Sequence, residues 1–114
     1  MKEGSIVLAR LPQVAGYEKN RPCLILRELP PYGDVLVCGI SSQIQHGMEG
    51  FDEFISYEDP DFQDSGLLVD SVIRLGFLAV LPKDRVLGTI GAIAPARHLR
   101  LCQRLAAHLY SENE

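Results

Sequence analysis

Apolar residues along this chain gather in short runs that are separated by proline, glycine and acidic residues. Two of these runs, 23–26 and 35–40, are joined by the segment 30–34, which reads Pro-Pro-Tyr-Gly-Asp. Short β-rich runs joined through such residues are typical of a hairpin. The pattern therefore predicts a central hairpin between residues 20 and 43, and we expect the rest of the chain to hold it in place.

Further strand patterns lie on both sides of the hairpin. They cover residues 5–11, 51–57, 72–81 and 86–91, and the second of them alternates between apolar and polar residues. Residues 13–21 are expected to form a polar loop at one end of the sheet, and residues 43–50 a connection that leaves the sheet.

A helical pattern begins at Pro95, a residue suited to a first helical turn, and runs to about Tyr110. The expected apolar stripe of this helix consists of Leu99, Cys102, Leu105, Ala106 and Leu109. Its basic residues, which we expect on a solvated face, are Arg97, Arg100, Arg104 and His108.

Five or six short strands followed by one helix predict a mainly β (α+β) fold. We expect a small, strongly bent β-barrel with the C-terminal amphipathic α-helix packed on it. The sequence shows no internal repeat and no linker, so residues 1–114 are expected to form a single domain.

Composition narrows the function classes. With 114 residues and 46% hydrophobic content, the chain is large enough to bury a core without staples. A net charge of −4 disfavours a protein that coats nucleic acid through bulk charge, so any such contact must be local. No apolar run approaches the ~20 residues of a membrane span, and the N-terminus has no signal-peptide pattern. We therefore expect a cytoplasmic protein with no membrane partner.

The cysteines do not indicate a metal or disulfide site. Cys23, Cys38 and Cys102 are odd in number, widely spaced and set in apolar patterns, which argues against a disulfide framework and against zinc. They are expected to be small core residues.

The segment 49–64 carries seven acidic residues and no Lys or Arg. Asp59, Asp61 and Asp64 suggest a calcium or magnesium site, because hard cations take clustered carboxylates. The spacing does not match an EF-hand loop, and Pro60 interrupts it. We expect a solvated acidic loop far from the hairpin's open end, and we predict no metal and no cofactor.

A candidate phosphate site lies at the open end of the predicted hairpin. In an antiparallel pair the start of the first strand lies beside the end of the second, so Arg21 should approach Ser41 and Ser42. The planar guanidinium donates two hydrogen bonds at once, and a serine hydroxyl donates a third. The alternative is an ordinary surface arginine near two serines that end a strand.

Two loop residues have both a chemical and a structural interpretation. His46 lies a few residues after Ser41 and would exchange protons near neutral pH, or would simply be solvated. Tyr17 would stack on a base, or would pack against the rim of the barrel.

The order of several motifs resembles a known family. The motifs are residues 4–7 (Gly-Ser-Ile-Val), 21–26 (Arg-Pro-Cys-Leu-Ile-Leu), 40–45 (Ile-Ser-Ser-Gln-Ile-Gln), 70–75 (Asp-Ser-Val-Ile-Arg-Leu) and 83–86 (Lys-Asp-Arg-Val). In this order and spacing they resemble the PemK/MazF family of toxin endoribonucleases from bacterial type II toxin–antitoxin systems, over almost the whole chain.

The resemblance implies an SH3-like barrel that works as a homodimer and cuts single-stranded RNA (mRNA) at short sequences without a metal. The family's catalytic arginine falls on Arg21, and its Thr or Ser partner falls on Ser41, with Ser42 adjacent. It also implies inhibition by a cognate antitoxin, and contact with operator DNA only together with that antitoxin. Without a metal, the accessible reaction is attack by the RNA's own 2′-hydroxyl, because this nucleophile is already tethered.

The chain departs from the family at two places. Many members carry Gly-Ser-Glu-Gln where this chain has Ala-Gly-Tyr-Glu at 15–18, so Glu18 is a displaced candidate for the proton acceptor, beside His46. Residues 76–80 (Gly-Phe-Leu-Ala-Val) replace a common Glu-Gln-Ile-Arg-Thr, so base preference is not carried over. The alternative function is a catalytically weak or inactive barrel that binds a protein or a nucleic acid without cutting it.

Overall fold

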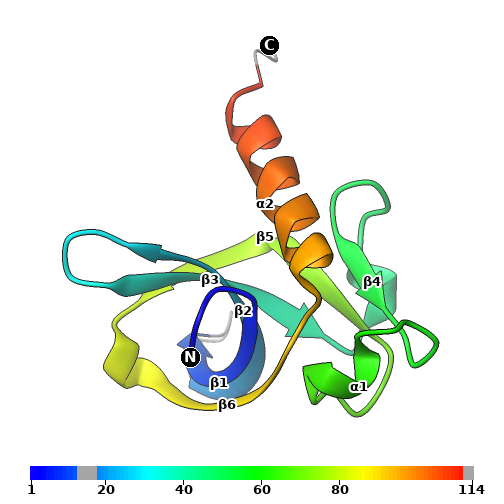
Figure 1. Cartoon of the computed structure of the whole chain (residues 1–114), viewed down its shortest axis with the longest axis horizontal. Coiled ribbons are helices and arrows are strands. Elements are labelled where there is room, and N and C mark those ends of the chain that lie inside the picture. The colour runs from blue at the N-terminus through cyan, green and yellow to red at the C-terminus, as the bar shows by residue number, and fades with distance from the viewer. Residues whose placement is uncertain (13–17, 112–114) are drawn as a thin grey trace.

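Strands dominate the molecule. A computed structural model describes residues 1–12 and 18–111, and Figure 1 shows a strongly twisted sheet with one long helix rising from it. In chain order the elements are β1 (Ser5–Pro12), β2 (Glu18–Leu29), β3 (Asp34–Ser41), the 3₁₀ turn η1 (Ile44–His46), β4 (Glu53–Ile55), α1 (Phe62–Ser65), β5 (Ser71–Leu81), the 3₁₀ turn η2 (Lys83–Arg85), β6 (Val86–Ala92) and α2 (Pro95–Leu109). The predicted mainly β class with a C-terminal helix is confirmed.

All strand pairs are antiparallel, and the strand order is β4-β5-β3-β2-β1-β6. The predicted hairpin is the β2–β3 pair at the centre of this sheet. Strand β2 begins earlier than expected, because Asn20 and Arg21 pair with Arg10 and Ala9 of β1. Residues 18–21, expected in a loop, are therefore strand. Conversely, the strand expected over 51–57 is limited to Glu53–Ile55.

Side chains from the two faces of the sheet form two separate cores. One core joins the sheet to helix α2 and contains Ile6, Leu24, Leu26, Cys38, Ile40, Ile55, Ile73, Leu75, Ile93, Leu101 and Leu105. The other is built from strand residues alone: Val7, Ala9, Leu11, Cys23, Ile25, Val35, Val37 and Leu81. Successive residues of a strand point to opposite faces, so strands buried on both faces read as continuous apolar runs. Cys23 and Cys38 are buried, as predicted, and Cys102 is half-buried.

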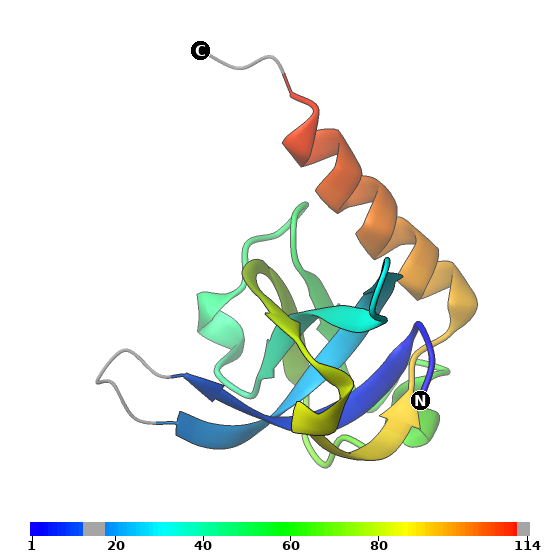
Figure 2. The ribbon, with the colours of Figure 1, turned by 90° about the vertical axis from the view of Figure 1, so that its left-hand side faces the viewer.

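Helix α2 starts at Pro95, as predicted, but it packs through a different face from the one expected. Leu101 and Leu105 are buried, whereas Leu99 is 56% exposed and Leu109 is 73% exposed. The predicted stripe was therefore wrong at both of its ends. The packed face follows the i, i+4 positions 97, 101 and 105. Figure 2 shows the last turns of the helix extending beyond the sheet, where no described strand lies against them.

Candidate functional site

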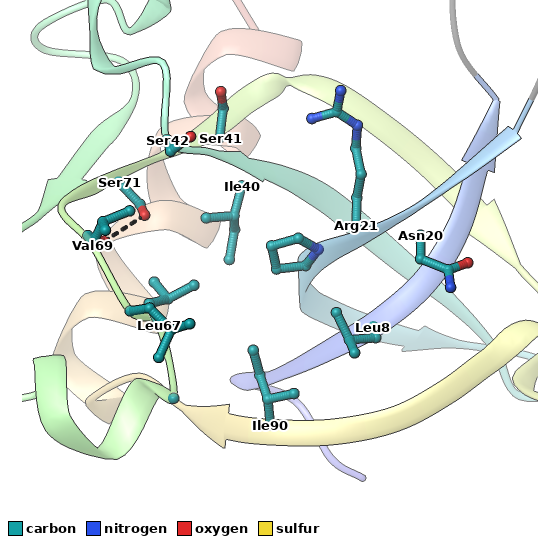
Figure 3. A pocket seen from close by; sticks show the side chains of 13 residues that line it. Leu8, Asn20, Arg21, Ile40, Ser41, Ser42, Leu67, Val69, Ser71 and Ile90 are labelled. Carbon is teal, nitrogen blue, oxygen red and sulfur yellow. Dashed lines mark hydrogen bonds between the residues drawn. The ribbon is translucent and has the colours of Figure 1, made fainter.

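The β2–β3 pair brings Arg21 and Ser41 together at one end of the sheet. The last β2–β3 pair at this end is Cys23 opposite Gly39, and Arg21 and Ser41 each lie two residues beyond it on their own strand. Directly opposed residues of an antiparallel pair project from the same face. In Figure 3 the guanidinium of Arg21 and the hydroxyl of Ser41 both point toward the same side. Both residues are half-buried.

These two residues lie at the rim of a cavity of about 470 Å³. Apolar side chains surround the hollow, as Figure 3 shows for Leu8, Ile40, Leu67 and Ile90. The rest of the lining consists of Asn20, Pro22, Ser42, Ser71 and the segment 66–69. In Figure 3 the side chains of Arg21 and Ser41 point away from the hollow, whereas Ile40 points into it. The site therefore consists of a polar edge formed by Arg21 and Ser41 and, next to it, an apolar cavity.

The wall made by Leu67, Leu68 and Val69 is held by close packing between α1 and β6. A Cβ atom added to Gly91 would lie 2.3 Å from the carbonyl oxygens of Asp64 and Ser65. Gly66, at the end of α1, has φ +76, and an added Cβ would lie 2.1 Å from the Ile90 oxygen. Both positions require the absence of a side chain, because backbone atoms cannot move aside. The far end of the wall is fixed by Ser71, whose hydroxyl donates to the Val69 oxygen at 2.8 Å.

The Ser41 hydroxyl is oriented by its own turn. Its oxygen accepts a hydrogen bond from the backbone N–H of Gln43 at 2.9 Å. Because this bond uses an oxygen lone pair, the hydroxyl proton stays available to a ligand. Ser42 is exposed and also lines the cavity.

The remaining candidates do not join this site in the part of the chain that the structure describes. His46 is exposed in η1 and is absent from the cavity lining. Tyr17 lies outside the described residues, as does the side chain of Glu18. No Asp, Glu or His is among the described residues that line the cavity. The identity of a proton acceptor stays a prediction.

Comparison with known families matches residues 2–109 to the PemK-like, MazF-like toxins of type II toxin–antitoxin systems. The chain belongs to this toxin family. Its toxins are typically endoribonucleases, and each is neutralised by an antitoxin. No curated protein matches the chain.

The acidic segment of this PemK/MazF-family chain differs from its prediction. The expectation of a solvated loop is wrong for Asp52, Glu53 and Asp61, which are each only 7% exposed. The expected solvated face of the helix is likewise wrong for Arg97, which is 8% exposed. Complementary charges from residues far apart in sequence are buried together.

Arg97 is the centre of this ion-pair cluster. Its Nε and Nη2 donate to the Asp61 carboxylate at 2.9 and 3.1 Å, and its Nη1 donates to Glu53 at 2.8 Å. Arg100 donates twice to Glu53, at 2.9 and 3.1 Å, and Arg104 lies 3.2 Å from the same carboxylate. Burial raises the pKa of Glu53, but the hydrogen bonds from Arg100 and the three cationic charges outweigh it, so the pKa lies below its usual range.

The pKa of Asp61 is also lowered. Burial raises it, but the hydrogen bonds from Arg97 and from the backbone N–H of Ala94 at 3.0 Å have a larger combined effect. Both carboxylates are therefore ionised and engaged within the fold. They are not available as bases or as cation ligands, so the acidic segment of this toxin-family chain serves stability.

Among the described residues, no three His, Cys, Asp or Glu side chains gather closely enough to hold a metal ion. None of the described helices is both long enough and apolar enough to cross a membrane.

Proposed function

We propose that this chain is a sequence-selective endoribonuclease toxin that cleaves single-stranded RNA without a metal and is inhibited by a cognate antitoxin. The observation that supports the proposal is that Arg21 and Ser41 both border one cavity, in a chain of this family. Contact with operator DNA, in this proposal, occurs only together with the antitoxin.

The proposed reaction is an internal transfer. The 2′-oxygen of the RNA forms a bond to the neighbouring phosphorus, and the bond from phosphorus to the 5′-oxygen breaks. The 2′-hydroxyl proton passes to a base, for which Glu18 and His46 are the candidates, and the leaving 5′-oxygen takes up a proton. The products carry a 2′,3′-cyclic phosphate and a 5′-hydroxyl.

Arg21 and Ser41 would act on the phosphate. Negative charge grows on the non-bridging oxygens as the five-coordinate phosphorus forms, and a guanidinium fork stabilises two of these oxygens at once. The Ser41 hydroxyl, whose oxygen accepts from the backbone N–H of Gln43, donates a hydrogen bond to the same phosphate. The apolar interior of the cavity would take a base or ribose next to the reacting phosphate.

The test is cleavage of a long single-stranded RNA, with the cut sites and fragment ends mapped. Arg21→Ala should abolish cleavage, and Arg21→Lys should fail nearly as badly because an ammonium cannot copy the fork. Ser41→Ala should lower the rate by about 10²–10³, the usual loss for one such donor. Ser42→Ala should have a smaller effect, because consecutive side chains of a strand project to opposite faces.

Arg27→Gln is the matched control, since Arg27 is exposed on the same strand and forms an ion pair with Glu3 at 3.6 Å on the protein surface. Wild-type rates in Arg21→Ala, or 5′ fragments that end in a free 3′-hydroxyl, would refute the mechanism. Full loss of cleavage in a chelator, restored by magnesium, would refute its metal independence.

A binding module without activity is the second candidate. It is favoured by the absence of Asp, Glu and His among the described lining residues, which leaves no placed base in the cavity. Under this function the wild-type chain would bind single-stranded RNA or a partner protein, yet leave RNA intact at enzyme concentrations equal to that of the substrate.

We also propose a homodimer, built on apolar side chains that α2 leaves uncovered. Leu78 and Val80 of β5 are 40% and 54% exposed, and they lie opposite Cys38 and Leu36 on the face that carries the helix. Monomers rarely leave adjoining apolar residues in water. Light scattering that gives a monomer of 12.6 kDa at micromolar concentration would contradict the dimer.

A further inference from the structure

Arg74 on β5 carries a buried polar atom with no protein partner. Its Nε is shielded from solvent and has no hydrogen-bond partner, and no ion pair of its guanidinium is formed with any residue that the structure describes. A buried donor without a partner is unfavourable, and in native proteins it calls for a specific reason. The arginines of α2 differ, because Arg97, Arg100 and Arg104 are all paired with Glu53.

The carboxylate of Asp52, which lies beside β5, does not explain Arg74. Asp52 contacts the neighbouring residue of β5, since its Oδ1 accepts from the backbone N–H of Leu75 at 2.9 Å. Its Oδ2 accepts from the backbone N–H of Met48 at 2.8 Å. Both oxygens of Asp52 are therefore engaged by the main chain, and Arg74 is not there to neutralise a buried carboxylate.

The strand register places Arg74 on the same face as Arg21 and Ser41, which is opposite to the face from which Ile40 enters the cavity. Arg74 lies opposite Gly39, and Gly39 also lies opposite Cys23 on the other side of β3. Two residues further on, Ser41 lies opposite Val72 of β5. Since opposed residues share a face and alternate residues return to it, Arg21, Ser41 and Arg74 all project from one face of the sheet. The β5 residue opposite Ser41 is Val72, and Arg74 lies two residues further along β5 on the same face.

The residue of β3 opposite Arg74 is Gly39, which contributes no side chain to this face. The ring of Phe77 takes that space, because a Cβ atom added to Gly39 would lie 2.8 Å from Cδ2 of Phe77. This part of the face is therefore lined by an aromatic ring and not by a side chain of β3.

We propose that Arg74 binds a second phosphate of single-stranded RNA, next to the phosphate contacted by Arg21 and Ser41. This inference rests on the proposed function. A guanidinium suits the task because it is always charged and donates in a planar fork to phosphate oxygens. With one cation on β2 and another on β5, the bound RNA backbone would run across β3. Because the net charge of the chain is −4, its contact with RNA must be local, and two arginines on one face provide such a local contact.

The experiment measures binding separately from cleavage. The probe is a single-stranded RNA oligonucleotide with 2′-O-methyl riboses, which lacks the attacking hydroxyl, and its dissociation constant is measured by fluorescence anisotropy over a range of salt concentrations. Arg74→Leu should weaken binding by about tenfold to a hundredfold, the loss of one charge-assisted pair. The slope of log K against log salt should shrink by about 0.7, the value for one phosphate contact on a single strand. Arg74→Lys should retain part of the affinity.

The control variant Arg27→Gln removes the same charge from an exposed site and should leave both the affinity and the salt slope unchanged. The thermal midpoint of Arg74→Leu should be equal to or above that of the wild type, because leucine removes the unpaired buried donor. On cleavable RNA the variant should raise KM more than it lowers kcat.

Unchanged affinity and slope in Arg74→Leu, with a wild type that binds RNA, would overturn this inference and leave the proposed function standing. A lower thermal midpoint that accounts for the lost binding would also overturn it, since Arg74 would then be structural. A wild-type chain that neither binds the probe nor cuts RNA would overturn the proposed function itself.

Discussion

Replacing Arg97 by methionine should destabilise this protein more than any other single loss of charge on α2. Methionine keeps a long, flexible side chain with good helix propensity, so the change chiefly removes the guanidinium. The wild-type side chain is 9% exposed and pairs with Glu53 and Asp61, whose side chains are 7% and 9% exposed. The variant therefore leaves buried carboxylates with fewer partners.

The size of the effect follows from which partners remain. Glu53 keeps Arg100 and Arg104, whereas the Asp61 carboxylate keeps the backbone N–H of Ala94 and loses both hydrogen bonds from Arg97. Removing one partner from a buried ion pair costs about 3–5 kcal/mol, because the other charge is left without compensation. A domain of this size has a free energy of unfolding of about 6–17 kcal/mol. The thermal midpoint should fall by about 12–20 °C.

The assay is thermal and urea unfolding followed by circular dichroism, with Arg100→Met as the matched control. Arg100 donates to the same Glu53, but its side chain is 50% exposed. Its loss should cost no more than about 1 kcal/mol, the usual range for an exposed pair. Equal and small effects of the two substitutions would refute the argument that burial makes the Arg97 pairs important.

The pH dependence gives an independent check with a defined sign. The pKa values of Glu53 and Asp61 are lowered in the folded state, so their stabilisation is present above the ordinary carboxyl pKa of about 4 and is lost as the pH falls through the folded values. Arg97→Met removes the largest stabilising partner of Asp61. The stability gap between wild type and variant should be widest near pH 7 and should narrow below about pH 4. A gap that widens in acid would contradict this assignment.

Three further predictions concern backbone packing and thiol chemistry. Gly91→Ala should lower both the thermal midpoint and the rate of RNA cleavage, because its Cβ would lie 2.3 Å from backbone atoms of α1. Gly88→Ala is the control, since an added Cβ there has nothing within 4 Å. A Gly91→Ala variant as stable as the wild type would contradict the close packing. Gly39→Ala should displace the Phe77 ring and weaken RNA binding. Gly76→Ala is the control, because Gly76 lies next to Phe77 on β5 with nothing within 4 Å of an added Cβ, and equal affinities of the two variants would argue against a role for this face. Burial raises the pKa of the Cys23 thiol to about 11, so iodoacetamide at pH 8 should leave this thiol unlabelled until the protein unfolds. Mass spectrometry measures the labelling, and rapid labelling of the native chain would contradict the burial of Cys23.

Local sequence patterns were sufficient for the parts of the fold that depend on neighbours in the chain. The hairpin could be predicted because its turn residues lie between two short apolar runs, and its geometry then brought Arg21 toward Ser41. The start of α2 at Pro95 could be predicted because proline fits the first helical turn. The order of motifs led to the correct family.

Tertiary structure alone decided how the charged residues are used. Arg97 lies 36 residues from Asp61 and 44 from Glu53, so a pattern read within either segment shows only an acidic stretch and a basic helix face. With Arg97 buried, positions 97, 101 and 105 face inward, so Leu105 of the predicted stripe is buried but Leu99 and Leu109 are left in solvent.

The candidate site shows the same division. The contribution of Arg21 and Ser41 follows from one hairpin. The cavity wall formed by residues 67–69, in contrast, depends on the contact of α1 with β6. Arg74 lies on the same face as Arg21 and Ser41 only because β5 pairs with β3. These positions depend on contacts between segments far apart in the chain. Complementary charges and close packing stabilise such contacts, and the pattern of apolar residues within one segment does not reveal them.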